Sequence, residues 1–308
     1  MRILNRLCTP DRPFLFCGVL IFSSLYALPQ CRPAHAAQVQ RSTLVLIGGG
    51  LRPTEALTSW IQGASRTGSA PRLGAIAWAS GEAEETLKRI REELKPLTDS
   101  PLETPPAEPG SDGFKSQELT RVLDWLSHLD GLYFTGGDQN RLIALFQLHP
   151  EIPARIRSRF ESGQLSVAGT SAGTAIQGLR VFTGNEDLTV IQPEALSLQP
   201  GLSLLPEAIV DQHFLRRQRH NRMLSALQAD PGLIGVAVDE DTALVLESQA
   251  SGKSKIRNGK VLGRGQVLVF IPKAGSNGKQ IELLITPHQE CLEWSASSPT
   301  PSPRSCSH

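Results

Sequence analysis

The chain has 308 residues, with 31 Lys and Arg against 30 Asp and Glu, a formal net charge of +1. This balance provides no polycationic surface for nucleic acid or for an anionic membrane. With 40% hydrophobic residues and a mean hydropathy of −0.15, the composition also excludes a disordered chain and a polytopic membrane protein.

Residues 1–36 have the three parts of a secretory signal peptide. Three arginines precede an apolar run over residues 14–28, and Ala34-His35-Ala36 provides a small-x-small cleavage site. A membrane anchor is the alternative interpretation, but this run is shorter than the roughly 20 residues that a spanning helix needs. We therefore expect cleavage near Ala36, export to the periplasm or the exterior, and no stable membrane insertion afterwards.

Cys31 raises the alternative of a lipoprotein, but Gln30 before it is not the small residue that lipidation favours, so lipid anchoring is not expected. Without residues 1–36 the net charge becomes −2, and only Cys291 and Cys306 remain of the five cysteines. In an oxidising compartment these two could form a disulfide; otherwise they are two thiols near the end of the chain. Two cysteines match no metal-site spacing.

Short apolar runs that end in glycine predict strands along the first half of the chain. They cover residues 43–48, 73–78, 131–136 and 165–169. The runs are mostly continuous rather than alternating, which is typical of strands buried on both faces of a parallel sheet. Helical patterns separate them, over residues 82–94, 117–129, 140–148 and 152–160. This alternation predicts an α/β fold with a doubly wound, mostly parallel sheet.

The proline-rich segment 99–113 interrupts the pattern and is expected to form a surface loop. After residue 201 the chain changes to short, partly antiparallel strands with one helix. The strands are predicted over residues 208–214, 234–238, 243–247, 265–271 and 281–286, and the helix over 215–228. The tail, residues 295–308, is rich in Ser and Pro and is expected to be poorly ordered. We thus expect one α/β domain over residues 37–294.

A candidate nucleophile, Ser171, lies in Gly169-Thr-Ser-Ala-Gly173, between a predicted strand over residues 165–168 and a short helix over 174–177. A G-x-S-x-G sequence in this context is typical of a nucleophile elbow, a sharp turn that exposes the serine Oγ. Small-residue turns are common, so the five residues alone are weak evidence; the strand and helix beside them strengthen it.

A catalytic serine needs a base. His213 ends the predicted strand 208–214, at the edge where open α/β sheets bind their ligands. His128 and His149 fall in or next to predicted surface helices, and His308 lies in the tail. His213 is therefore the candidate base, although a histidine at a strand end is often structural.

The acid that orients the base has several candidates. Asp239-Glu240-Asp241 follows an apolar strand and is either a solvated turn or the source of the acid. Asp187 or Glu207 would instead match the Ser–acid–His order that is common in G-x-S-x-G hydrolases. The order of residues leaves this choice open.

Two glycine clusters and an arginine cluster accompany these residues. Residues 48–50 form a glycine triplet after the first strand, but the spacing of a dinucleotide-binding motif is absent. The backbone amides of Gly137 and Ala172 are candidates for an oxyanion hole. Residues 216–222 contain four arginines; such a run is usually a solvated helix face, but near an active site it would suit a substrate carboxylate.

Five motifs occur in order between residues 44 and 270. They are Ile47-Gly-Gly-Gly50, Phe134-Thr-Gly-Gly-Asp-Gln139-Asn-Arg141, Gly169-Thr-Ser-Ala-Gly173, Asp211-Gln-His-Phe214 with its arginines, and Gly235-Val-Ala-Val-Asp-Glu240-Asp-Thr-Ala243. As a set they resemble the cyanophycinase family of serine peptidases, which includes aspartyl dipeptidases. The resemblance implies a flavodoxin-like or class I glutaminase-like three-layer sandwich, with additional strands in the C-terminal part.

The resemblance also assigns roles. Ser171 would be the nucleophile, His213 the base and Glu240, in preference to its two neighbours, the acid. The implied substrate contacts are Gln139, Asp211, Gln212, Arg217, Arg219 and Arg222. No cofactor or metal is implied, and a homodimer is compatible with the resemblance.

The implied activity is exopeptidase cleavage of cyanophycin, a polyaspartate with arginine on its side chains, to β-Asp-Arg dipeptides. The expected partners are thus cyanophycin or an aspartyl-arginine peptide, and not nucleic acid. An exported aspartyl or isoaspartyl dipeptidase is the alternative. A non-catalytic binding protein on the same fold is a further one, but it would have no need of the three catalytic residues.

Overall fold

A computed structural model of the chain describes residues 41–65, 70–251, 254–276, 279–295, 298–304 and 306. The predicted signal peptide lies outside the described residues. In the ranges just given, none of the helices combines the length and the apolar composition that crossing a membrane requires.

Parallel strands form one half of a nine-stranded sheet in the described part of the chain. In spatial order these are β1 (Arg41–Ile47), β5 (Ser166–Thr170), β4 (Gly131–Phe134), β2 (Leu73–Ile76) and β3 (Leu102–Glu103). On the other side of β1 the sheet continues with antiparallel strands: β10 (Thr242–Ser251), β11 (Ser254–Gly263), β14 (Cys291–Ser295) and β15 (Ser298–Arg304). The four strands predicted in the first half of the chain are confirmed.

A second sheet of the described residues has six strands. In spatial order these are β13 (Ile281–Pro287), β12 (Gln266–Pro272), β9 (Ile234–Val238), β8 (Leu205–Gln212), β6 (Gly178–Phe182) and β7 (Leu198–Pro200). β6, β8 and β9 are parallel, whereas β7, β12 and β13 run antiparallel to their neighbours. The predicted fold class is confirmed, but the strands are divided between two sheets, which the sequence pattern did not indicate.

The helices connect the parallel strands. They are α1 (Thr54–Ala64), α2 (Ala83–Leu94), α3 (Ser116–His128), α4 (Gln139–Leu148), α5 (Glu151–Glu161), α6 (Ala172–Ala175) and α7 (His220–Ala229), with a 3-10 helix η1 (Pro193–Ala195). Helix α1 was not predicted. The helix predicted over residues 215–228 begins later, at His220, because residues 214–219 form turns.

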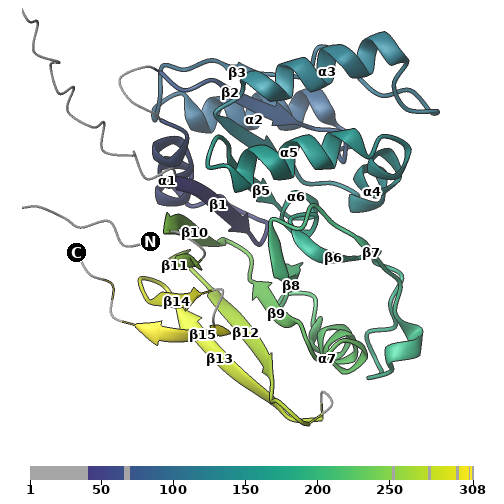
Figure 1. Cartoon of the computed structure of the whole chain (residues 1–308), viewed down its shortest axis with the longest axis vertical. Helices are drawn as coiled ribbons and strands as arrows, with labels where there is room; N and C mark the ends of the chain where they lie inside the picture. The colour runs from purple at the N-terminus through teal and green to yellow at the C-terminus, as the bar shows by residue number, and fades with distance from the viewer. Residues whose placement is uncertain are drawn as a thin grey trace, which may run out of the picture. The chain divides into compact units, whose positions relative to one another are not determined.

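The apolar runs of the strands are continuous because both faces are covered. Leu44 and Leu46 of β1 belong to a core that includes residues of α3, α4 and α5, and Figure 1 shows these helices on one side of the parallel strands. Val45 and Ile47 point the other way, into a core shared with α1 and α2. Adjacent residues of a strand face opposite sides of the sheet, so each run supplies both cores.

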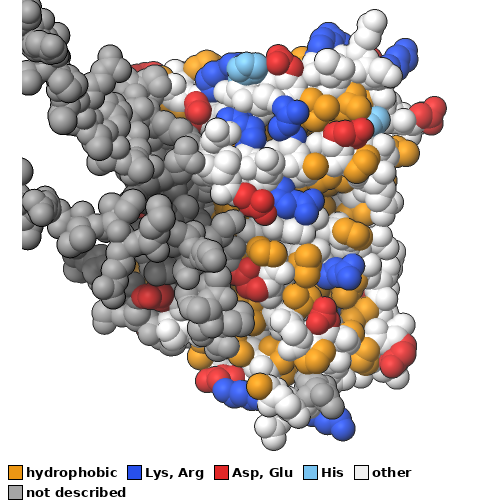
Figure 2. Space-filling model, in the orientation of Figure 1, with side chains coloured by type: hydrophobic (Ala, Val, Ile, Leu, Met, Phe, Trp, Pro, Cys, Tyr) orange, Lys and Arg blue, Asp and Glu red, His pale blue; other side chains and the backbone are white. Residues whose placement is uncertain are grey.

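Charges are interspersed on the face that Figure 2 shows. Lys and Arg side chains lie among Asp and Glu side chains and apolar groups, without a continuous area of one sign. This distribution agrees with the near-zero net charge of the chain.

The proline-rich segment 99–113 contains the two-residue strand β3 and a single bridge between Gly110 and Gly113, and is otherwise irregular. The prediction that the tail is poorly ordered is wrong in part, because Ser298–Arg304 forms strand β15, which pairs with β14. β15 is the edge strand of its sheet, where prolines are tolerated because one side of the backbone needs no partner.

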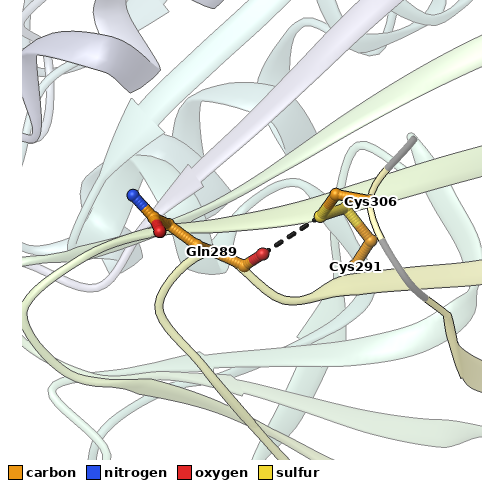
Figure 3. The surroundings of a disulfide bond; sticks show 3 residues. All are labelled: Gln289, Cys291 and Cys306. Atoms are coloured by element: carbon orange, nitrogen blue, oxygen red, sulfur yellow. Dashed lines mark hydrogen bonds between the residues drawn. A yellow bond between two sulfur atoms is a disulfide. The ribbon is translucent and has the colours of Figure 1, made fainter. Parts of the chain in front are cut away.

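A disulfide connects the end of the chain to β14 (Figure 3). Cys291 and Cys306 are bonded, with their Cα atoms 5.3 Å apart, and Cys306 Sγ lies 3.0 Å from the carbonyl oxygen of Gln289. Of the two alternatives left open by the sequence, the structure has the disulfide.

Removing this disulfide is expected to destabilise the protein without affecting the reactive serine. The two cysteines are 15 residues apart, and a cross-link of that span contributes about 3 kcal/mol by restricting the unfolded chain. We expect Cys306→Ser to unfold at a lower urea concentration than the wild type, and wild type in reductant to match it. Equal unfolding midpoints for the oxidised wild type and the variant would contradict the disulfide.

Candidate active site

Ser171 lies at a strained turn between β5 and α6. Its φ of 53° and ψ of −116° are unusual for a residue other than glycine. The turn needs its flanking glycines, since a Cβ at Gly169 would lie 2.3 Å from the carbonyl oxygen of Gly173, and one at Gly173 would lie 2.3 Å from that of Phe134. The backbone N–H of Ser171 donates to the carbonyl of Ile47 (3.0 Å), which fixes the turn to the end of β1. This geometry is the predicted elbow.

His213 directly follows the last residue of β8 and has a positive φ of 48°. Its Nε2 lies 2.8 Å from Ser171 Oγ. The His213 N–H donates to the carbonyl of Gly48 (2.8 Å), so a main-chain bond holds the residue beside the end of β1. Serine and histidine come from different sheets and meet at hydrogen-bond distance.

The acid beside the base is Glu240, whose Oε1 lies 2.6 Å from His213 Nδ1. Its neighbours have other partners: Asp241 Oδ1 accepts from the N–H of Leu51 (2.6 Å), and the N–H of Asp239 donates to the carbonyl of Gln266 (3.2 Å).

The earlier alternatives for the acid lie elsewhere. Asp187 Oδ1 accepts from the N–H of Thr189 (2.8 Å), and Glu207 lies near the start of β8, away from His213 at its end. The structure therefore brings together Ser171, His213 and Glu240.

The glycine triplet 48–50 packs against both the histidine and the acidic turn. A Cβ on Gly49 would lie 2.1 Å from His213 Cε1, and the φ of Gly49, +110°, also favours glycine. The carbonyl of Gly49 accepts from the N–H of Asp241 (2.9 Å), and the N–H of Gly48 donates to the carbonyl of Thr242 (3.0 Å). Close packing within the chain thus accounts for the triplet.

The environment of His213 favours its neutral form. Burial lowers the pKa of the imidazole below its ordinary value of 6.5, and the positive charges of Arg217 and Arg219 lower it further, whereas Glu240 raises it. Because the net effect is a lowered pKa, the ring is unprotonated and able to accept a proton at neutral pH.

Two backbone amides next to Ser171 suit an oxyanion hole. Ala172 is the first residue of α6, where an N–H has no partner within the helix. Gly137 has a φ of +140°, and a Cβ on it would lie 2.1 Å from the carbonyl oxygen of Ala79, so only glycine fits. Among the described residues, neither of these two N–H groups donates to a backbone carbonyl of a turn, a loop or a helix cap. A preorganised pair of donors would stabilise a developing oxyanion.

Four of the six residues assigned to the substrate contact one another. Arg222 donates through Nε to Asp211 Oδ2 (2.8 Å) and through a terminal nitrogen to Asp211 Oδ1 (2.5 Å). Arg219 donates to Asp211 Oδ1 (3.3 Å) and to Gln212 through both its side-chain oxygen (2.8 Å) and its carbonyl (2.7 Å). We call these four residues, together with Glu186, the buried ion network.

Sequence reasoning missed Glu186, whose carboxylate accepts from Arg222 (3.1 Å). The Arg222 guanidinium also stacks on Phe182, 4.5 Å from the ring centroid, and the residue is 2% exposed. Burial lowers the pKa of Arg219 to about 10, which still leaves it charged at neutral pH. The network joins the end of β8, just before His213, to α7 and to the segment after β6.

The other two residues assigned to the substrate differ from these four. Gln139 is buried and donates to the carbonyl of Phe182 (2.9 Å), while Arg217 is exposed and close enough to His213 to lower its pKa. None of the six lines the cavity at the serine, so their contact with substrate remains a prediction.

The cavity at Ser171 has a volume of about 440 Å³. Besides the serine and His213, its lining includes residues of both glycine clusters. It also includes charged residues that sequence reasoning missed: Arg52, Glu82, Glu85 and Arg89. The last three come from α2 and the residue before it. The many charged residues between 82 and 94 were the only feature of the sequence that could have pointed to them. In the described part of the chain, no group of three or more His, Cys, Asp or Glu is arranged to hold a metal ion.

Comparison with known proteins identifies the family of the chain and a similar fold. The model of Peptidase family S51 matches residues 44–252. A cyanophycinase from Trichormus variabilis is 38% identical over 157 residues, 50% of this chain and 49% of that protein. Thus the chain spans about half the length of that relative. A cyanophycinase from Synechococcus elongatus is 29% identical over 248 residues, 80% of this chain and 73% of that protein.

A solved structure of a peptidase from an acI-B1 Actinobacterium has a similar fold. It is 20% identical, with a TM-score of 0.58, over 83% of this chain and 99% of that chain.

Gly49→Ala is expected to displace the His213 ring, because the added methyl group would overlap the imidazole. We expect the rate at which a fluorophosphonate probe labels Ser171 to fall about 100-fold, since small displacements of catalytic groups have effects of that size. Gly110→Ala is the control, because its Cβ has no atom nearer than 3.6 Å. Labelling of Gly49→Ala at the wild-type rate would contradict the packing described.

Proposed function

The chain belongs to peptidase family S51, and on this premise we propose that it is a serine peptidase that degrades cyanophycin to β-Asp-Arg dipeptides. The observation that carries the proposal is the aligned triad at the elbow. Ser171 Oγ lies 2.8 Å from His213 Nε2, and His213 Nδ1 lies 2.6 Å from Glu240 Oε1. Such spacing lets a histidine activate a serine.

In the proposed reaction, Ser171 Oγ attacks the backbone carbonyl carbon of an aspartyl residue, and His213 Nε2 accepts the hydroxyl proton. Glu240 stabilises the resulting imidazolium through Nδ1. The amides of Gly137 and Ala172 bind the oxyanion. Collapse of the tetrahedral intermediate expels the amine, which takes the proton from His213. A water molecule then attacks the acyl carbon and gives a proton to His213 Nε2; the bond to Ser171 Oγ breaks, Oγ takes that proton, and the product acid is released.

The choice of cyanophycin as substrate is supported by the relatives, which are cyanophycinases. The charges of the cavity are compatible with it. Each unit of cyanophycin carries a carboxylate and a guanidinium, and the lining includes both cations and anions, among them Arg89 and Glu82. Complementary charges provide specificity for such a unit.

We further propose that the protein is exported. The first 36 residues have the composition of a signal peptide. The Cys291–Cys306 disulfide supports export, because disulfides persist mainly in oxidising compartments. An exported enzyme would degrade polymer released by other cells.

Activity is expected to persist to lower pH than an ordinary histidine would allow. His213 must be neutral to accept the proton, and burial, with Arg217, lowers its pKa. The acidic limb of kcat/KM should therefore lie below pH 6.5, the ordinary histidine value. Arg217→Gln removes a cation that disfavours the imidazolium, so it should move the limb to higher pH. Arg216→Gln is the control; an unchanged limb in Arg217→Gln would contradict this account.

The substrate proposal is tested by incubating the protein without residues 1–36 with insoluble cyanophycin and measuring β-Asp-Arg. We expect release by the wild type and a loss of about 1,000-fold or more in Ser171→Ala, because the nucleophile is removed. Ser162→Ala, an exposed serine outside the cavity, is the control. Equal release by wild type and Ser171→Ala would refute the mechanism. Cleavage of short aspartyl or isoaspartyl dipeptides but not of the polymer would select the dipeptidase.

A further inference from the structure

Helix α2 contributes charged residues to the active-site cavity that none of the predicted roles uses. Glu85, Thr86 and Arg89 lie on its first two turns, and Glu82 immediately precedes it. All four line the same cavity as Ser171. A substrate held at the serine would therefore contact this helix.

Ion pairing within the chain leaves one of these charges free. Arg89 Nε donates to Glu85 Oε1 (3.0 Å), and Arg52 forms an ion pair with Glu93. Among the described residues, the Glu82 carboxylate has neither an ion-pair partner nor a side-chain hydrogen bond. The charges of the cavity lining are thus paired, apart from one exposed anion.

Capping of helix α2 does not explain why residue 82 is a glutamate. Glu82 is the N-cap residue of α2, where Ser, Thr, Asp and Asn are the residues that stabilise a helix through their side chains. Its side chain makes no capping hydrogen bond; instead its N–H donates to Ser80 Oγ (3.0 Å), and its carbonyl accepts from the N–H of Thr86 (3.0 Å). The backbone forms the turn, and the carboxylate is available for a ligand.

A second cavity adjoins the first and shares Glu82 with it. Its volume is about 500 Å³, and its lining includes Glu82, Glu84 and Glu85 against a single cation, Lys88. Gly81, Glu82 and Glu85 line both cavities. The space therefore extends from the serine across the start of α2, and Glu82 lies at the junction, where the acidic residues begin.

The acidic residue previously assigned to the substrate is already engaged. Asp211 is 1% exposed, and its two oxygens accept from Arg222 and Arg219. A substrate guanidinium in the cavity would therefore need another carboxylate. A carboxylate without an ion-pair partner suits it best, because it can accept two parallel hydrogen bonds from the guanidinium.

We propose that Glu82 binds the guanidinium group of the substrate and so selects an arginine-bearing unit; this inference rests on the proposed function. The guanidinium of a β-Asp-Arg unit is several bonds away from the scissile carbonyl. It would thus bind at the junction of the two cavities while the carbonyl lies at Ser171. The exposed carboxylate of Glu82 forms this ion pair without disrupting one within the chain.

The test compares two short synthetic peptides. One is made of β-Asp-Arg units, and the other is made of β-Asp-citrulline units. Citrulline keeps the shape of arginine but has no charge. We expect the wild type to prefer the arginine peptide at least tenfold in kcat/KM. Glu82→Gln should lose about tenfold on the arginine peptide, mainly through KM, and keep its rate on the citrulline peptide, because a charged hydrogen bond is lost. Glu82→Asp should recover part of the preference.

Glu92→Gln is the matched control, because Glu92 is exposed on the same helix and lines neither cavity. Thermal unfolding of all variants checks the fold. Equal losses of Glu82→Gln on both peptides, or an unchanged preference for arginine, would overturn the role of Glu82 while leaving the proposed function intact. A wild type that cleaves neither peptide, though its Ser171 reacts with a fluorophosphonate, would overturn both.

Discussion

The close approach of the glycine turn 48–50 to three other segments is the constraint on which the active site depends. The carbonyl of Ile47 accepts from Ser171, that of Gly48 from His213, and that of Gly49 from Asp241. Consecutive carbonyls at the end of one strand thus hold Ser171, His213 and the turn that contains Glu240. Side chains at 49 or 50 would overlap His213 or Asp241, so this approach requires glycine. These main-chain bonds keep the three segments side by side, and the side-chain contacts of Ser171, His213 and Glu240 form between them.

The same region contains backbone strain that surrounding contacts hold in place. Ser171, His213 and Asp241 all have positive φ angles, at 53°, 48° and 56°. Such conformations each cost on the order of 1–3 kcal/mol and persist where neighbouring structure restrains them. The buried ion network provides one restraint, since Arg222 and Asp211 join β8 to α7 just before His213. Buried charges of this kind are costly to leave unpaired, which favours a single arrangement of the network.

The triad also lies where the two sheets meet. Ser171 follows β5 of the first sheet, and His213 follows β8 of the second. Glu240 lies in the turn from β9 of the second sheet to β10 of the first. The chain crosses from one sheet to the other at the acid, so the site depends on the packing between sheets as well as on each sheet. The cavity beside Ser171 is also lined by α2, which contributes charged side chains that are not part of the triad.

The sequence by itself determined the buried strands of the parallel core, the elbow and the candidate nucleophile and base, because these depend on local patterns: apolar runs, small residues around Ser171, and a histidine at a strand end. It did not predict several of the shorter or antiparallel strands, such as β6, β7 and β14. It did not separate Glu240 from Asp239 and Asp241 without a family resemblance, since adjacent residues of a turn point in different directions. Nor did it show the two sheets, the strand within the tail, or that Arg219 and Arg222 bind Asp211. Only the tertiary structure decided these points, because ion pairing and cavity lining depend on which distant residues the fold brings together.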